Sequence, residues 1–254
     1  MGKYFIDTEG NDDQAYLEAM RFACKLADDD SEVKRIVILV HTKNNTGWFE
    51  RLLGHEGVKR LLAGTKISGC ATLFKIETMK TFDDYSSVNI VIACALDSQD
   101  LYKIDDFLTV RSIIAIPWLR ERVAEWIGTW GPLDIRNQKV VPAFEAPSCV
   151  VQRAMRSLTS TINMSTGISH PSDNERAKTF ILALHKYEAK LDANQVAGFL
   201  IRELGWATDA AQEIAKLIAT LNEGKFFKGG ERTGLQHHYK RWKEECQRGV
   251  ADDE

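Results

Sequence analysis

Short runs of isoleucine and valine alternate with amphipathic helical patterns through the first half of the chain, and this alternation constrains the fold most. The run from Ile36 to Val40 is uninterruptedly apolar, as expected for a strand that is covered on both faces. Repeated strand–helix alternation favours a parallel sheet between two layers of helices, joined by right-handed crossovers. We therefore expect a Rossmann-like, mostly parallel, three-layer α/β domain.

The expected elements follow from the spacing of apolar residues. Strands are predicted at 4–7, 34–40, 70–76, 89–96 and 112–116, and helices at 12–27, 48–62, 100–108 and 119–129.

The second half of the chain has a different pattern. Prolines and turn formers without a sustained period predict a connector at 136–147, which separates an α/β domain at 1–135 from a helical domain at 148–254. Within the second domain, Ser172 and Glu175 predict a capping box, and Gly229-Gly230 predicts a β-hairpin. Helices are predicted at 149–162, 173–189, 192–204, 208–222 and 236–247.

Two helices separated by Gly205-Trp206 and followed by a hairpin resemble a winged helix-turn-helix in layout. The resemblance covers about 45 residues. It implies an α-helical, winged-helix-like domain that contacts nucleic acid or another protein.

Charge and cysteine usage exclude some classes of protein. With 33 basic and 36 acidic residues the net charge is −3, which argues against a uniformly basic nucleic-acid binder but permits a local basic patch. The apolar runs are too short to span a membrane, and the first residues lead directly into a strand, which leaves no room for a signal peptide. Five widely spaced cysteines indicate a reduced, cytoplasmic setting in which most serve as small core residues.

Ligands of open α/β sheets bind beyond the carboxyl ends of the strands, so we looked there for a site. The segment after the second predicted strand combines a lysine, hydroxyls and a glycine before a helix, which can form an anion cradle. No glycine-rich nucleotide motif accompanies it, and a helix-capping turn explains the same residues. The candidate residues for a small anionic, nucleotide-like ligand are Thr42, Lys43, Asn45, Thr46, Gly47, Thr78 and Ser98.

Carboxylates at the ends of the first and fourth predicted strands suggest a second kind of site. Asp7 and Asp97 are loosely similar in placement to the carboxylates of Mg²⁺-dependent nucleases with Rossmann-like sheets, which implies a candidate metal site and catalytic pair. Helix capping by Asp12 and by Asp97 is the structural alternative. His41, at a strand end, is the one histidine that we consider as an acid–base candidate.

A basic segment lies near the C-terminus. Its cations would contact phosphates rather than read bases, because the preceding helix at 208–222 carries Asp209 and Glu213 against Lys216 alone. Self-association as a homodimer and a solvated helix face are the alternatives. The candidate nucleic-acid contacts are Lys225, Lys228, Arg232, Lys240, Arg241 and Lys243.

Three functions remain open from the sequence. The first is a regulatory binding protein whose α/β domain binds a small anion and whose helical domain contacts nucleic acid or a partner, a layout familiar in prokaryotic regulation and defence. The second is a Mg²⁺-dependent nuclease or phosphohydrolase that uses Asp7 and Asp97. The third is an assembly component without a small ligand.

Overall fold

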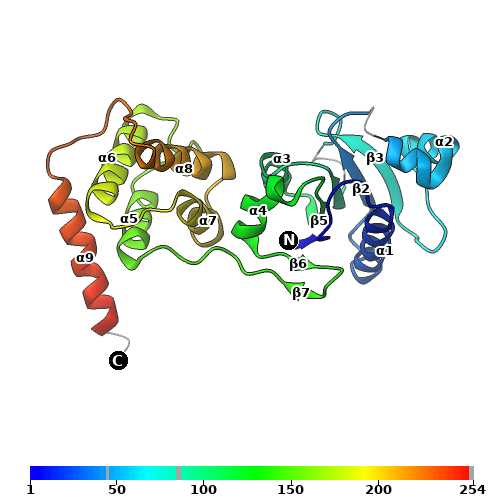
Figure 1. The fold of residues 1–254 in the computed structure, drawn as a ribbon, viewed down its shortest axis with the longest axis horizontal. Coiled ribbons are helices and arrows are strands. Elements are labelled where there is room, and N and C mark those ends of the chain that lie inside the picture. The colour runs from blue at the N-terminus through cyan, green and yellow to red at the C-terminus, as the bar shows by residue number, and fades with distance from the viewer. Residues whose placement is uncertain (44–45, 84–86, 252–254) are drawn as a thin grey trace. The chain divides into compact units, whose positions relative to one another are not determined.

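The chain forms two compact units, Met1–Ala143 and Phe144–Glu254. A computed structural model describes residues 1–43, 46–83 and 87–251 (Figure 1). The division falls inside the segment 136–147, which the sequence pattern assigns to a connector. We refer to the two parts as the α/β unit and the helical unit.

The described strands of the α/β unit form one sheet of seven strands, in the order β3-β2-β4-β5-β1-β6-β7. All pairings from β3 to β6 are parallel, and β7 alone is antiparallel. The central strands form here because their isoleucines and valines are buried on both faces of the sheet. The strands are β1 (Gly2–Phe5), β2 (Arg35–Val40), β3 (Leu73–Thr78), β4 (Asn89–Cys94), β5 (Val110–Ile116), β6 (Leu133–Asp134) and β7 (Lys139–Val140).

Helices cover both faces of this sheet. Ile36 and Ile38 join an apolar cluster with α1 and α2, whereas the alternating Val37 and Leu39 are buried outside that cluster. On the other face, α3 packs against β5 and α4. The mixed α/β class and mostly parallel sheet are therefore as predicted. The helices are α1 (Asp13–Asp29), α2 (Gly47–Ala63), α3 (Ser98–Asp105) and α4 (Ala124–Trp130), with a 3-10 turn η1 (Arg120–Val123) before α4.

Strand order distinguishes the sheet from the 3-2-1-4-5 arrangement that begins the usual Rossmann order. After β1 the chain passes over β5 and β4 to reach β2, so β1 lies beside β5 rather than in the centre. From β2 the chain turns outward to β3, and from β4 it turns the other way to β5. The direction therefore reverses between β2 and β4, and their carboxyl ends form the topological switch point.

Helices joined by loops make up unit Phe144–Glu254, and its described residues contain no strand. In this unit α7 packs on α8, and α9 packs on α5 and α6 (Figure 1). Trp242 of α9 is fully buried, with its ring centroid 4.8 Å from that of Phe180. The amphipathic spacing of α9 thus attaches the last helix to the core and leaves its cations outside. The helices are α5 (Cys149–Thr159), α6 (Pro171–Tyr187), α7 (Ala193–Leu204), α8 (Thr208–Asn222) and α9 (Leu235–Ala251).

The predicted hairpin is wrong, because residues 223–234 contain turns and bends but no strand. A winged-helix assignment of this unit is therefore not confirmed. Gly229 and Gly230 both have positive φ angles, and a side chain at Gly229 would collide with the carboxylate of Glu175. The two glycines thus allow the loop to approach α6 closely, instead of forming a two-residue turn between strands.

The capping box at Ser172 is also wrong. Helix α6 begins at Pro171, a residue type that suits the first helical position because it has no N–H to leave unpaired. Glu175 accepts a hydrogen bond from the backbone N–H of Gly230, so it does not return to its own helix start.

The cysteines differ in part from the prediction. Cys70 and Cys94 are buried and Cys24 is half-buried, and all three are free thiols. Cys149 and Cys246, however, form a disulfide that joins α5 to α9 across a sequence separation of 97 residues. Such wide spacing gives no sequence pattern for a pair.

Among the described residues, no helix has both the length and the apolar character that crossing a bilayer requires.

Candidate functional site

The segments that follow the parallel strands gather at one edge of the sheet, as predicted. Strands β1 to β5 run in the same direction, so their carboxyl ends share that edge. The backbone N–H of Gly10, after β1, donates to the carbonyl of Trp118, after β5, at 2.7 Å. Loops far apart in the sequence are therefore in direct contact here.

At this edge of the sheet, Asp7 forms an ion pair with an arginine. Its carboxylate pairs with the Arg120 guanidinium at 2.5 Å, and Arg120 also lies over the ring of Phe5. The backbone carbonyl of Asp7 accepts from Arg136 at 3.5 Å. Asp7, the predicted catalytic carboxylate, thus forms an ion pair that connects the segment after β1 to η1.

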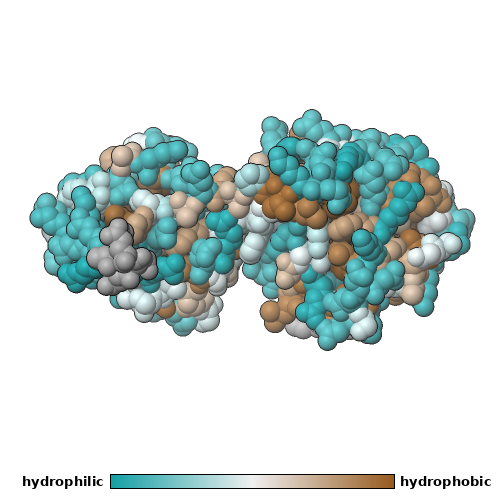
Figure 2. Space-filling view, turned by 90° about the horizontal axis from the view of Figure 1, so that it is seen from below, coloured by the Kyte–Doolittle hydropathy of each residue, from teal (hydrophilic) through white to brown (hydrophobic). Residues whose placement is uncertain are grey.

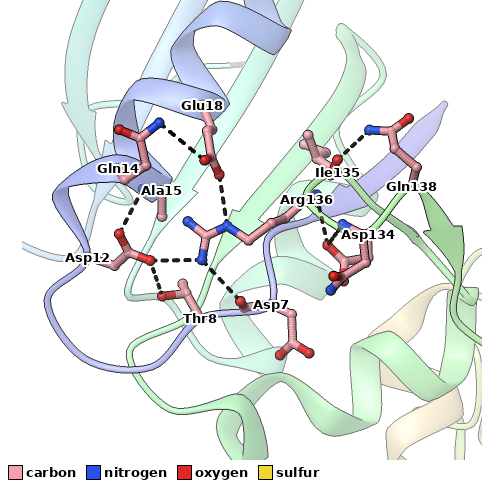
Figure 3. A network of polar contacts seen from close by, with 11 residues as sticks. Asp7, Thr8, Asp12, Gln14, Ala15, Glu18, Asp134, Ile135, Arg136 and Gln138 are labelled. Carbon is pink, nitrogen blue, oxygen red and sulfur yellow. Dashed lines mark hydrogen bonds and ion pairs between the residues drawn. The ribbon is translucent and has the colours of Figure 1, made fainter.

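Arg136 is the centre of the network in Figure 3. Its guanidinium donates to Asp12 at 2.9 Å and to Glu18 at 3.0 Å, which connects the segment after β6 to the start of α1. Thr8 donates to the same Asp12 carboxylate at 2.9 Å. Asp12 in turn caps α1 by accepting from the N–H of Ala15 at 3.1 Å, which confirms the capping alternative for this residue.

These contacts change the protonation of Asp12. Partial burial disfavours its charged form, but hydrogen bonds from Arg136, Thr8 and the Ala15 N–H outweigh burial, so the pKa of Asp12 lies below its usual value. The carboxylate is therefore ionised at neutral pH and stabilises the folded arrangement of this loop.

Asp97 caps α3 by accepting from the N–H of Asp100 at 3.1 Å, as the capping alternative predicted. Strand β5 lies between β4 and β1, so the strands that Asp97 and Asp7 follow are about 10 Å apart. Within the described ranges, no group of three or more histidine, cysteine or acidic residues is placed to hold a metal ion. The residues present therefore do not fit a shared Mg²⁺ site, because its ligands must lie within about 2.1 Å of the ion.

At the switch point, His41 lies next to a carboxylate from the neighbouring strand end. Its Nδ1 is 3.6 Å from Asp100 on α3, and Lys103 approaches the other oxygen of Asp100 at 3.1 Å. The side chains of His41 and Lys103 are largely exposed, whereas that of Asp100 is mostly buried. Asp100 thus lies beside two exposed side chains, the imidazole of His41 and the ammonium group of Lys103.

The predicted anion cradle lies at the same switch point, in the segment that follows β2. Thr42 and Lys43 are exposed, whereas Thr46 is buried and donates to the Lys43 carbonyl at 3.2 Å. Gly47 begins α2, and Thr46 makes no side-chain cap for it. Asn45 lies outside the described residues.

Two further predicted ligand residues have structural contacts. Thr78 ends β3 in a tight turn, where its N–H donates to the hydroxyl of Thr81 at 2.9 Å. The hydroxyl of Ser98 donates to the carbonyl of Arg122 and accepts from the N–H of Trp126, at 3.0 and 3.2 Å. Ser98 therefore fastens α3 to the start of α4.

The basic residues of the helical unit are arranged differently. Lys228, Lys240 and Lys243 are exposed, and none has an ion pair within the described part of the chain. Lys225 is paired with Glu223 at 2.7 Å. Arg241 donates to Ser157 at 3.1 Å and lies 3.7 Å from Glu245, so it partly faces its own unit.

Phe226 lies in the same segment as these cations. The residue is 77% exposed, the largest value for a bulky apolar residue in the described helical unit. The guanidinium of Arg232 lies 5.9 Å from the ring centroid. Beside the ring is a groove of about 380 Å³ with an apolar floor that includes Leu182 and Leu221. Its rim is basic and consists of His185, Lys186, Lys225 and Arg232.

Comparison with known proteins concerns the helical unit. Residues 147–243 match a family described as a domain of unknown function, DUF1889. The match covers less than half of the chain. No match was found among curated proteins.

The sequence analysis missed Phe226, Arg120 and Arg136. An aromatic residue inside a glycine- and lysine-rich loop is a detectable pattern, since such a loop has little core to bury it in. The two arginines had no such pattern, because their partners are distant in sequence. Figure 2 shows hydrophilic side chains over much of the face that it presents, with apolar areas among them.

Proposed function

We propose that the helical unit binds single-stranded nucleic acid on the surface formed by Phe226, Arg232, Lys225, Lys228 and Lys240. One base stacks on Phe226, and the cations contact the phosphates on either side of it. The observation that carries this proposal is the exposed Phe226 ring with a guanidinium against it, inside a cationic loop.

An aromatic ring among cations supports strand binding for a physical reason. Every base has a flat face, so stacking on an aromatic side chain is available to any sequence, and basic groups follow the backbone. Moreover, burying an exposed phenylalanine against a base removes apolar surface from water, which provides part of the binding free energy.

Binding of α8 in the major groove of a duplex has less support. The hairpin that would form a wing is absent from residues 223–234. Helix α8 presents Asp209 and Glu213 with Lys216, and this balance of charge would repel phosphates. We therefore expect single strands to bind in preference to duplexes.

The test is binding of a fluorescently labelled oligodeoxythymidylate of about 20 nucleotides, followed by anisotropy. Phe226→Ala should weaken binding by a factor of between about 5 and 150, because one stacked base contributes about 1–3 kcal/mol. Leu108→Ala is the matched control, since Leu108 is a 96% exposed apolar residue of the α/β unit.

Equal affinity of Phe226→Ala and the wild type would refute stacking on this residue. If the same sequence binds equally tightly as a duplex and as a single strand, the proposed preference for single strands is refuted. Phe226 is exposed, so its replacement leaves the core intact and the comparison remains interpretable.

A further inference from the structure

A second hollow in the helical unit lies away from the Phe226 ring, with walls from α5, α6, α9 and the loop at Gly230. Its volume is about 600 Å³, within the range of small-molecule sites in proteins. Ser157, Ser172 and Thr179 provide hydroxyl groups in its lining, and Phe180 provides an apolar face. The cavity is thus mainly polar, with one surface suited to a ring.

Arginines enter this cavity from two helices. Arg176 of α6 uses one terminal nitrogen, Nη1, for the Thr161 carbonyl at 2.5 Å and for Asp173 at 3.4 Å. Arg241 of α9 uses Nη2 for Ser157 at 3.1 Å, and its Nε lies 3.7 Å from Glu245 on the same helix. A guanidinium carries five N–H donors, so each arginine keeps donors that have no hydrogen-bond acceptor among the described residues.

The two carboxylates of the lining, Glu175 and Glu231, already accept hydrogen bonds. Glu175 accepts from the N–H of Gly230 at 2.6 Å and pairs with Lys178 at 3.4 Å, and the Gly230 hydrogen bond lowers the pKa of Glu175. Glu231 accepts from the hydroxyl of Thr233 at 2.6 Å. Both carboxylates thus have donors already, whereas the guanidinium N–H groups of Arg176 and Arg241 that make none of the contacts above are available to an anionic ligand.

His238 adds a group without a partner. Its Nδ1 atom is buried and makes no hydrogen bond within the described chain, although a buried polar atom of this kind normally has one. The imidazole ring lies 5.4 Å from Phe180 and 5.9 Å from Trp242, centroid to centroid, so packing fixes its orientation. Burial lowers the pKa of His238, and the charges of Arg241 and His237 lower it further.

We infer that this cavity binds a phosphomonoester of nucleotide size, with the phosphate between Arg176 and Arg241 and the imidazole of His238 hydrogen-bonded to it or to the attached sugar. A tetrahedral phosphate accepts hydrogen bonds from several directions, which suits donors on separate helices better than a planar carboxylate does. The inference goes beyond strand binding, because it requires neither Phe226 nor an oligonucleotide.

Calorimetric titration with adenosine 5′-monophosphate tests the inference on the full chain. We expect saturable binding, weakened at least about tenfold in Arg176→Gln and in Arg241→Gln, and no binding of adenosine. Arg248→Gln is the matched control, because Arg248 is an exposed arginine of α9 outside the cavity, and its affinity should equal that of the wild type. Binding of adenosine as tightly as its monophosphate, or unchanged affinity in both variants, would overturn the inference.

A measurement on the wild-type chain covers the case in which a variant does not fold. The imidazole proton resonances of His238 should shift on addition of adenosine 5′-monophosphate, while those of exposed His55 in the α/β unit stay in place. No shift at His238 at saturating concentrations would exclude the site.

The phosphomonoester can belong either to a free nucleotide or to the 5′ end of a strand, and a further experiment distinguishes the two. Inorganic phosphate and the mononucleotide test for a free ligand, whereas a 5′-phosphorylated oligodeoxythymidylate against its 5′-hydroxyl counterpart tests for the end of a strand. Preference for the phosphorylated strand over the mononucleotide assigns the cavity to a strand end, and the reverse preference assigns it to a free nucleotide. The outcome is separate from that of Phe226→Ala, which alters stacking and leaves the cavity unchanged.

Discussion

The strand-end edge of the α/β unit and the cationic segment 225–243 of the helical unit are both rich in charge, yet they use it in opposite ways. At the strand ends, Asp7 pairs with Arg120 and Asp12 pairs with Arg136. In the cationic segment, Lys228 and Lys240 are exposed without an ion pair in the described chain.

The difference shows why density of charge alone is a poor guide to a binding site. Paired charges satisfy each other and connect loops, so a ligand must compete with the partners that are already in place. Unpaired, solvated cations cost little to bring against phosphates, since the counterions released from the nucleic acid drive the association.

The largest expected effect concerns the disulfide. It joins two helices of the helical unit, α5 and α9. Reduction of Cys149–Cys246, or the double change Cys149→Ser and Cys246→Ser, should lower the stability of the helical unit by about 2–4 kcal/mol, because the bond closes a long loop of the unfolded chain. Hydrogen exchange read by mass spectrometry should show faster exchange in α5 and α9 and unchanged protection in the α/β unit.

The double variant is its own control for the reductant, since reduction should have no further effect on it. Equal protection of α5 and α9 with and without reductant, in protein whose disulfide is verified by mass, would contradict the prediction.

A smaller loss of stability is expected when the ion pairs of Arg136 are removed. Arg136→Ala should destabilise the α/β unit by about 1–2 kcal/mol, since it removes hydrogen bonds to two carboxylates whose side chains are only partly exposed. Urea denaturation measures the change, with Arg21→Ala on the exposed side of α1 as control. Oligonucleotide affinity should stay as in the wild type, and a loss of affinity in Arg136→Ala would break the contrast between the two regions.

The smallest effect is a dependence on pH. Because the pKa of folded Asp12 lies below its usual value of 3.8, its charge stabilises the folded state above that value, and the contribution is lost as the pH falls through the lower, folded pKa. Asp12→Asn keeps a capping side chain but removes the charge. The stability difference between wild type and variant should thus be present at about pH 5 and shrink below about pH 3, as followed by thermal unfolding.

A difference between wild type and Asp12→Asn that is constant across this range would show that the charge of Asp12 contributes nothing.

Local patterns predicted much of the fold and little of its long-range order. The uninterrupted apolar run at 36–40 identified β2 because a strand buried on both faces requires one. Nothing in any single segment specifies that β1 lies beside β5, since that order depends on how all the layers pack together. Gly229-Gly230 was misinterpreted because close approach to α6 and a tight hairpin turn both require glycine.

For the candidate sites too, the sequence predicted local positions but not the partners that are distant in sequence. The sequence located Asp7 and Asp97 at strand ends, but it could not reveal that Arg120 would pair with one of them or that the other would cap α3. Arg176, Arg241 and His238 come from helices distant in sequence, and their convergence on one cavity exists only in the folded chain.

The salt dependence of oligodeoxythymidylate binding is the most direct test of the claim that the unpaired cations contact phosphates. Each lost contact should reduce the slope of log affinity against log salt by about 0.7, so Lys228→Ala, Arg232→Ala and Lys240→Ala combined should flatten it by about 2. Lys190→Ala with Lys216→Ala, two exposed lysines elsewhere in the helical unit, should leave the slope as it is in the wild type. An unchanged slope in the triple variant, or an equal flattening in the control, would contradict the account.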